Sequence, residues 1–92
     1  KLDNSARIAQ LINTAVASKS SELHARDFNT LSVSVVDFSN ELPQGIPGPK
    51  TATYTVSVRS GNPDIKDIAF TITYTNSGAT VTNTFKTSVG NI

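Results

Sequence analysis

The only histidine of this 92-residue chain is His24, and histidine is the side chain that most readily exchanges a proton near neutral pH. Serines are abundant, so a serine nucleophile beside His24 is conceivable. However, the chain contains no G-x-S-x-G turn of the kind that presents such a serine. His24 falls near the end of a predicted helix, where a charged imidazole interacts favourably with the helix dipole. We therefore interpret His24 as a solvated helix-end residue, and we expect no catalytic residue and no enzymatic activity.

A second group of reactive side chains lies in one predicted turn. Asn62, Asp64 and Asp67 offer oxygen ligands of the kind that calcium prefers. Their spacing differs from that of an EF-hand loop, and Lys66 lies among the carboxylates. These residues are the one metal candidate, but the pattern favours a solvated turn. We expect neither a metal nor another cofactor.

Composition narrows the class of protein further. The chain has no cysteine, so disulfides and thiolate ligands are excluded. The net charge is +1 and the basic residues are scattered, whereas nucleic-acid binding needs a basic cluster. No apolar run approaches the roughly 20 residues of a membrane span. The lack of cysteine and methionine fits an oxidising exterior, and we expect a protein that binds no nucleic acid.

The first part of the chain has the apolar spacing of an amphipathic helix at about residues 4–25. Asp3, Asn4 and Ser5 offer side-chain oxygens that can cap its N-terminus. The apolar residues that share one stripe of this helix, with Val16 at the margin, are Ile8, Leu11, Ile12, Ala15 and Leu23.

The remainder alternates apolar residues with serine and threonine, which is the period of a strand with one buried and one solvated face. A Pro- and Gly-rich segment at 40–50 predicts a surface loop, and residues 60–64 predict a turn. The four expected strands lie at about residues 30–39, 51–60, 68–75 and 79–89. The sequence therefore predicts one α+β domain over residues 1–92, with an N-terminal helix packed on a four-stranded antiparallel sheet.

Three strands carry threonine at every second position, which places the threonines on one face. This pattern favours a solvated sheet face over a threonine array that binds a ligand. An open sheet of this kind has two edges, and edges that lack strong protection recruit partners. The threonines concerned are Thr51, Thr53, Thr55, Thr71, Thr73, Thr75, Thr80, Thr82 and Thr84.

The segment from Ser5 to Ser18 resembles the exposed half of the long N-terminal helix of type IV pilins and pseudopilins. In that family a Ser/Thr/Gly-rich connection and a four-stranded antiparallel sheet follow the helix, which is similar to the order predicted here. The resemblance implies the globular domain of a pilin, or the globular subunit of a split pilin. Such a protein is a structural subunit of an extracellular or periplasmic pilus-like filament and acts by packing against copies of itself or other pilin subunits.

The resemblance also implies roles for individual helix residues in subunit packing. The apolar ones would form the core on the sheet side, and the charged ones would be charge partners between subunits. The apolar set is Ile8, Leu11, Ile12 and Ala15, and the charged set is Arg7, Lys19 and Glu22.

A second interpretation is a secreted cystatin-like α+β module that binds a protein partner. In that case the loop at residues 44–48 would contact the partner, although this loop lacks the usual central motif of those inhibitors. The two interpretations share a fold class and differ in which surface meets a partner.

Overall fold

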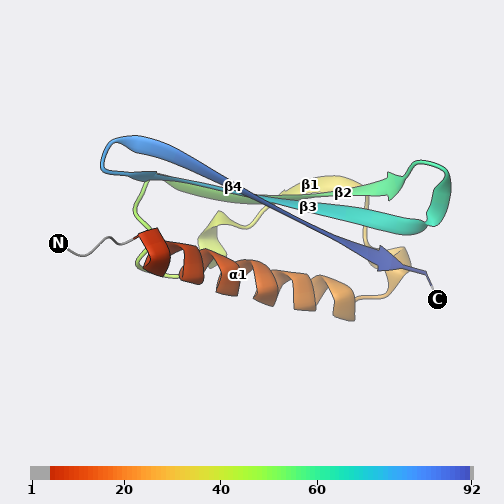
Figure 1. Cartoon of the computed structure of the whole chain (residues 1–92). Coiled ribbons are helices and arrows are strands. Elements are labelled where there is room, and N and C mark those ends of the chain that lie inside the picture. Colours follow the sequence, from red (N-terminus) through yellow and green to blue (C-terminus); the bar gives the residue numbers. More distant parts are fainter. Residues whose placement is uncertain (1–4, 92) are drawn as a thin grey trace.

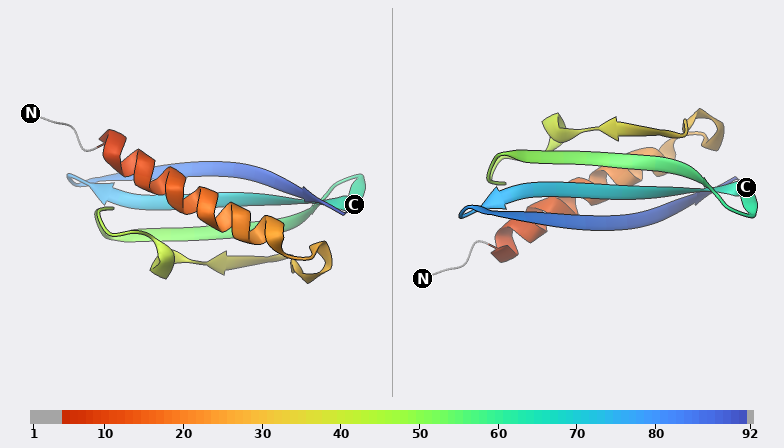
Figure 2. Two further views of the ribbon diagram at one scale, coloured as in Figure 1. Left: turned by 90° about the horizontal axis from the view of Figure 1, so that it is seen from below. Right: turned by 90° about the horizontal axis from the view of Figure 1, so that it is seen from above.

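The computed structural model describes residues 5–91, in which one helix, α1 (Ser5–Ala25), lies diagonally across one face of a sheet (Figures 1 and 2). The sheet has four antiparallel strands in the order β1-β2-β3-β4. The molecule is elongated, with extents of 49 × 20 × 20 Å. The strands are β1 (Ser34–Asp37), β2 (Lys50–Arg59), β3 (Asn62–Asn76) and β4 (Ala79–Gly90). The predicted α+β fold class, a helix on a four-stranded antiparallel sheet, is therefore confirmed.

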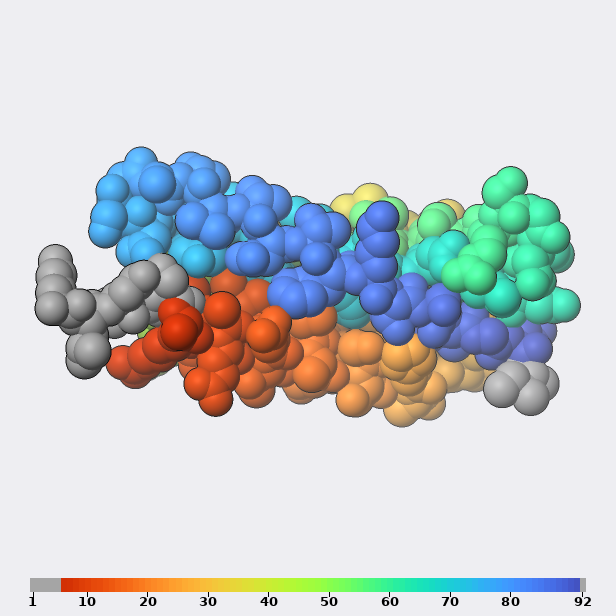
Figure 3. Space-filling model, in the orientation of Figure 1, coloured from red at the N-terminus to blue at the C-terminus, as the bar shows by residue number. Residues whose placement is uncertain are grey.

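The core lies between α1 and the inner face of the sheet. Phe38, Tyr54 and Phe70 form an aromatic cluster at its centre, with ring centroids 5.9 to 6.3 Å apart. Space-filling shows α1 packed directly against β4 along the middle of the molecule (Figure 3). The apolar stripe of α1 therefore supplies a large part of the cover of this face.

The buried stripe of α1 differs in part from the predicted one. Val16, expected at the margin, is buried, whereas Leu11 and Ala15 are only half-buried. Lys19 also falls on the buried stripe. The stripe follows a spacing of four, four, three and four residues, through Ile8, Ile12, Val16, Lys19 and Leu23. The expected capping residues Asp3 and Asn4 lie outside the described residues, and Ser5 is already helical.

The first strand is much shorter than the predicted range of 30–39. A 3₁₀ turn, η1 (Phe28–Thr30), precedes it, and Asp27 caps this turn by accepting a hydrogen bond from the Asn29 amide at 3.2 Å. Lys66 holds the same segment by donating from Nζ to the Phe28 carbonyl at 2.8 Å. Local side-chain bonds to the backbone therefore replace strand pairing before Ser34.

The second half of the predicted first strand ends in the same way. Asp37 accepts a hydrogen bond from the Ser39 amide at 2.8 Å and another from the Ser39 hydroxyl at 2.6 Å. A second 3₁₀ turn, η2 (Ser39–Glu41), begins there. The strand stops because these bonds turn the backbone out of the sheet.

The proline-rich segment at 40–50 was predicted to be a surface loop, but part of it belongs to the core. Leu42 and Ile46 are buried, and Ile46 accepts a hydrogen bond at its carbonyl from Lys50 Nζ at 3.2 Å. Gly45 has φ of +104°, and a side chain built there would meet Leu11 Cδ1 at 3.0 Å. The loop is therefore docked on the first half of α1.

The third strand begins at Asn62, six residues before its predicted start at 68, so the predicted turn at 60–64 contracts to Ser60 and Gly61. Proline is tolerated inside this strand because the pairing with β2 shifts between Val58 and Arg59. Pro63 lies in the stretch left without a partner residue on β2 or β4. Its missing N–H group therefore costs no ladder hydrogen bond.

Threonines on neighbouring strands meet in rows on the outer face, opposite α1. Thr53, Thr71 and Thr84 form one such row across β2, β3 and β4. The threonines of these strands are exposed or half-exposed. This arrangement is the solvated face that the alternation predicted.

Candidate functional site

The charged residues of α1 form a cluster within the chain. Lys19 Nζ lies 2.7 Å from Glu22 Oε2 and 2.7 Å from Glu41 Oε1 in η2. The ammonium also lies 5.6 Å from the centroid of the Phe38 ring. Burial lowers the pKa of Lys19, but the hydrogen bonds and charges of the two glutamates outweigh that effect and raise it above its usual value.

Lys19 and Glu22 pair with each other within the chain, and the expectation that they are charge partners between subunits stays a prediction. Lys19 is buried against its own sheet, and Glu22 also pairs with Arg26 at 3.2 Å. Hydrogen bonding from Lys19 is the largest cause that holds the pKa of Glu22 below its usual range. Arg7 differs, because it is exposed on the first turns of α1.

His24 lies at the end of α1, as predicted, and links the helix to β4. Its Nε2 atom is 3.1 Å from the Ser88 carbonyl oxygen, and its Nδ1 atom is 3.3 Å from Ser20 Oγ. The side chain is exposed, and the Thr87 hydroxyl oxygen lies 3.5 Å from Nε2. His24 therefore contacts two hydroxyls and one backbone carbonyl, and these contacts link the end of α1 to β4.

The candidate calcium ligands do not converge. Asn62, Asp64 and Asp67 lie on β3 rather than in a turn, so Asp67 points to the opposite face from the other two. Arg59 pairs with Asp67 through two hydrogen bonds, at 2.7 and 3.2 Å. Within residues 5–91 no three histidine, aspartate or glutamate side chains are placed to hold a metal ion.

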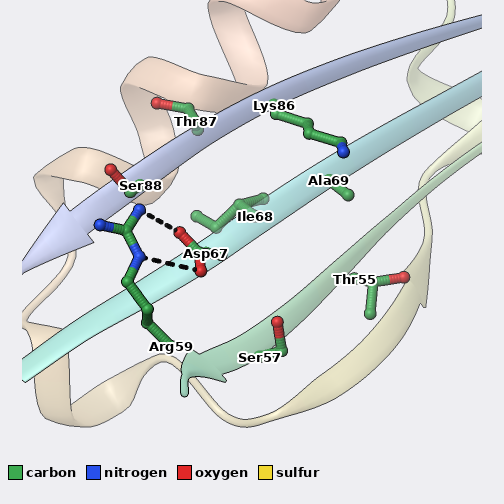
Figure 4. Close-up of a pocket in the computed structure, with 9 residues that line it drawn as sticks. All are labelled: Thr55, Ser57, Arg59, Asp67, Ile68, Ala69, Lys86, Thr87 and Ser88. Atoms are coloured by element: carbon green, nitrogen blue, oxygen red, sulfur yellow. Dashed lines mark hydrogen bonds and ion pairs between the residues drawn. The ribbon is translucent and has the colours of Figure 1, made fainter. Parts of the chain in front are cut away.

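A charged hollow of about 560 Å³ lies on the outer face, near the end of the sheet where Arg59 and Asp67 pair (Figure 4). Its floor is Ala69, which stands in a row between Thr55 and Lys86. The small side chain of Ala69 leaves a depression among longer neighbours. The hydrogen bond from Arg59 is the main cause that lowers the pKa of Asp67. Within the described part of the chain, Arg59 is therefore committed to Asp67, whereas Lys86 forms no ion pair.

The backbone groups of β4 that point away from β3 form one open edge of the sheet. The Asn91 amide donates to the Asp64 carbonyl at 2.7 Å, which shows that odd-numbered positions of β4 bond to β3. The N–H and C=O groups of Thr80, Thr82, Thr84 and Lys86 therefore point outward. The contact of His24 with Ser88 covers the C-terminal part of this edge.

The opposite edge of the sheet is β1. The Phe38 amide donates to the Ala52 carbonyl at 2.8 Å, so even-numbered positions of β1 face β2. The backbone groups of Val35 and Asp37 consequently point outward. Val33 and Val35 are also exposed at their side chains, by 62% and 69%. The sequence pattern predicted two edges but not which residues would be open on them.

Comparisons with known proteins give no match. No protein-family model, curated protein or solved structure is significantly similar to this chain. The α+β class and the surfaces described above therefore come from the sequence pattern and the structure of this chain. Within the described residues, no helix has the length and apolar character needed to cross a membrane.

Proposed function

We propose that this chain is a structural subunit of an extracellular or periplasmic pilus-like filament and acts by packing against copies of itself or other pilin subunits. The observation that carries this proposal is the fold: a single helix covers one face of a four-stranded antiparallel sheet and leaves two edges open. The same order of elements accompanies the helix sequence that resembles pilins. The role is one of assembly rather than catalysis.

The contacts within the domain suit a filament subunit that must stay rigid when force acts on the filament. The aliphatic stripe of α1 and the ion pairs of Lys19 tie the helix to the sheet and to η2. His24 adds a link from the helix end to β4. These contacts come from three separate elements, so force on one element is shared by the others.

The surfaces that remain for packing are distinct from this internal scaffold. The outward side of α1 carries exposed polar residues, including Arg7 and Gln10. The sheet edges carry unpaired backbone groups, which favour addition of another strand. Both kinds of surface are available without rearrangement of the core.

Immunogold labelling of the native assembly under negative stain tests this function directly. Antibody against the chain should decorate filaments along their length, and filaments should be missing when the chain is deleted. Reintroduction of the chain should restore them. Filaments that persist unlabelled after deletion would overturn the proposal.

A further inference from the structure

We propose that copies of this chain join edge to edge, with β1 of one copy adding to β4 of the next as an antiparallel strand. This inference rests on the proposed function, because it specifies one surface through which copies assemble. The occupant of the β4 edge is therefore a second copy of the chain. The joined sheets would continue as a single antiparallel sheet.

The topology makes this joining possible without a change of direction. Four strands that alternate in direction leave β1 and β4 running oppositely, so β1 of a copy placed beside β4 is antiparallel to it. The two edges are different surfaces, and a contact between different surfaces builds an open filament when its rotation does not close into a ring. In Figure 2 the first turns of α1 extend past the β4 edge. An added strand would therefore lie over them.

The open backbone groups define a register for the added strand. His24 covers the C-terminal end of the β4 edge, which leaves Thr84 and Lys86 as the nearest open positions. Val35 and Asp37 are the open positions within β1. A register that sets Asp37 opposite Thr84 also sets Val35 opposite Lys86. All four residues then exchange hydrogen bonds as pairs.

Side chains agree with this register on both faces of the sheet. On the inner face it sets Val36 opposite Phe85, and both are half-buried residues that pack against the core. They would form a non-hydrogen-bonded pair, in which side chains approach most closely. On the outer face Asp37 lies diagonally from Lys86, within reach of a long side chain. The contact is thus apolar inside and charge-complementary outside.

Pairing of β4 with β4 of another copy is the main competing contact. That arrangement would bring together two edges whose charge comes from Lys86, with no acidic partner. It would also leave Val35 exposed. The β1–β4 contact covers the aliphatic edge and pairs opposite charges, so the described surfaces favour it.

Cysteine cross-linking tests the register, because the natural chain contains no cysteine. A Val36→Cys protein mixed with a Phe85→Cys protein should yield a mixed disulfide under mild oxidation. Such a pair has Cα atoms about 4.5 Å apart, within the range that disulfides accept. The matched control is Val35→Cys mixed with Phe85→Cys, because Val35 lies next in the strand but on the other face. We expect several-fold more mixed dimer from the first mixture.

Equal yields from the two mixtures would overturn the proposal. A dominant Phe85→Cys homodimer would also overturn it, since that product requires β4 to meet β4. Circular dichroism melting of each variant shows whether the half-buried substitutions preserve the fold.

A charge swap on exposed residues gives a second test that does not depend on core positions. Asp37→Lys and Lys86→Glu should each weaken self-association in concentration-dependent sedimentation. The double variant should restore it, because every β1–β4 contact contains one residue of each kind. A double variant that associates no better than the single variants would overturn the contact.

The outcomes separate this inference from the proposed function. Labelled filaments combined with negative cross-linking and no charge rescue would refute the edge contact and leave the filament role standing. Positive cross-linking and charge rescue without labelled filaments would refute the filament role and retain the edge contact.

Discussion

Replacement of Lys19 asks whether its charge or its hydrocarbon stem stabilises the fold. The residue is 7% exposed, while its partners Glu22 and Glu41 expose 48% and 58% of their side chains. Removal of the ammonium therefore returns two carboxylates to water rather than stranding them in the core. Removal of the stem leaves a gap beneath α1.

The expected free energies indicate that the hydrocarbon stem of Lys19 stabilises the fold more than its charge does. Lys19→Ala deletes three buried methylenes at about 0.8 kcal/mol each, with a further cost for the cavity. For the ammonium, attraction to half-exposed carboxylates is largely offset by the cost of desolvation. We therefore expect Lys19→Ala to lose about 2–3 kcal/mol of unfolding free energy. Lys19→Met, which keeps the apolar volume, should lose less than about 1 kcal/mol.

Urea unfolding followed by circular dichroism measures the free energy of unfolding of both variants, and thermal melts of the same proteins give their Tm. For a domain of this size, the loss in Lys19→Ala corresponds to a fall in Tm of roughly 10–20 °C. The Met variant should melt close to the natural protein. If Lys19→Met falls as far as Lys19→Ala, the ion pairs stabilise the helix and the reasoning from the stem is wrong.

The pH dependence provides an internal check on the same residue. The pKa of Lys19 is raised on folding, so the contribution of its charge is complete below the unfolded value of about 10.4 and is lost as pH rises through the folded value. The pKa of Glu22 is lowered, so its contribution is present above about 4.3 and is lost as pH falls through the folded value. In thermal melts measured from acid to alkaline pH, Lys19→Met should lose less stability than the natural protein at both ends of the pH range.

Three further perturbations follow from the packing and the outer face. Ile12→Asp should cost several kcal/mol because it buries an unpaired charge, and Leu11→Asp should cost less because Leu11 is half-buried; equal melting of the two variants would contradict the described stripe. Arg59→Gln should raise the pKa of Asp67 toward its ordinary value in a carboxyl NMR titration, and should remove the contribution to stability that is lost as pH falls through the lowered pKa. Gly45→Ala should cost about 1–2 kcal/mol in thermal melts, because φ is +104° and the new methyl would meet Leu11; an unchanged Tm would count against this loop geometry.

The change of hydrophobic period predicted the helix and the sheet, and Ile8, Ile12 and Leu23 are buried where that period placed them. The centre of the helix stripe was less predictable. Lysine is usually counted as a surface residue, although its stem can lie along apolar surface while its head reaches polar partners. The available signal was Glu22 three residues after Lys19, together with a spacing that runs from Ile12 through Val16 to Lys19 and Leu23.

The observed ends of the strands depend on hydrogen-bond partners rather than on the residue composition from which they were predicted. Valine and phenylalanine favoured a long first strand, but side-chain bonds from Asp27 and Asp37 to nearby amides turn the backbone away. Gly61 and Pro63 indicated a long turn, yet the shifted pairing at Arg59 accommodates the proline within β3. Such outcomes depend on partners that are distant in sequence, which a local pattern does not contain.

The charged hollow could not be predicted because it depends on register. Arg59 and Asp67 are eight residues apart, and only the pairing of β2 with β3 brings them within 2.7 Å. Lys86 joins them through the separate pairing of β3 with β4. Register also separates residues that are close in sequence. Asn62, Asp64 and Asp67 were expected in one turn, but they lie on β3, where successive side chains alternate between faces.

The two open edges also explain how such a sheet can associate without indiscriminate aggregation. A long unprotected edge would accept many strands in many registers. Here His24 covers one end of β4, and Lys86 places a positive charge on the part of this edge that stays open. The complementary edge is only four residues long and carries Asp37 at its end. A contact this short is weak when alone, but repeated contacts that hold copies side by side raise their effective concentration. The edges therefore favour association that strengthens as the protein concentration rises, which is the dependence that sedimentation measures.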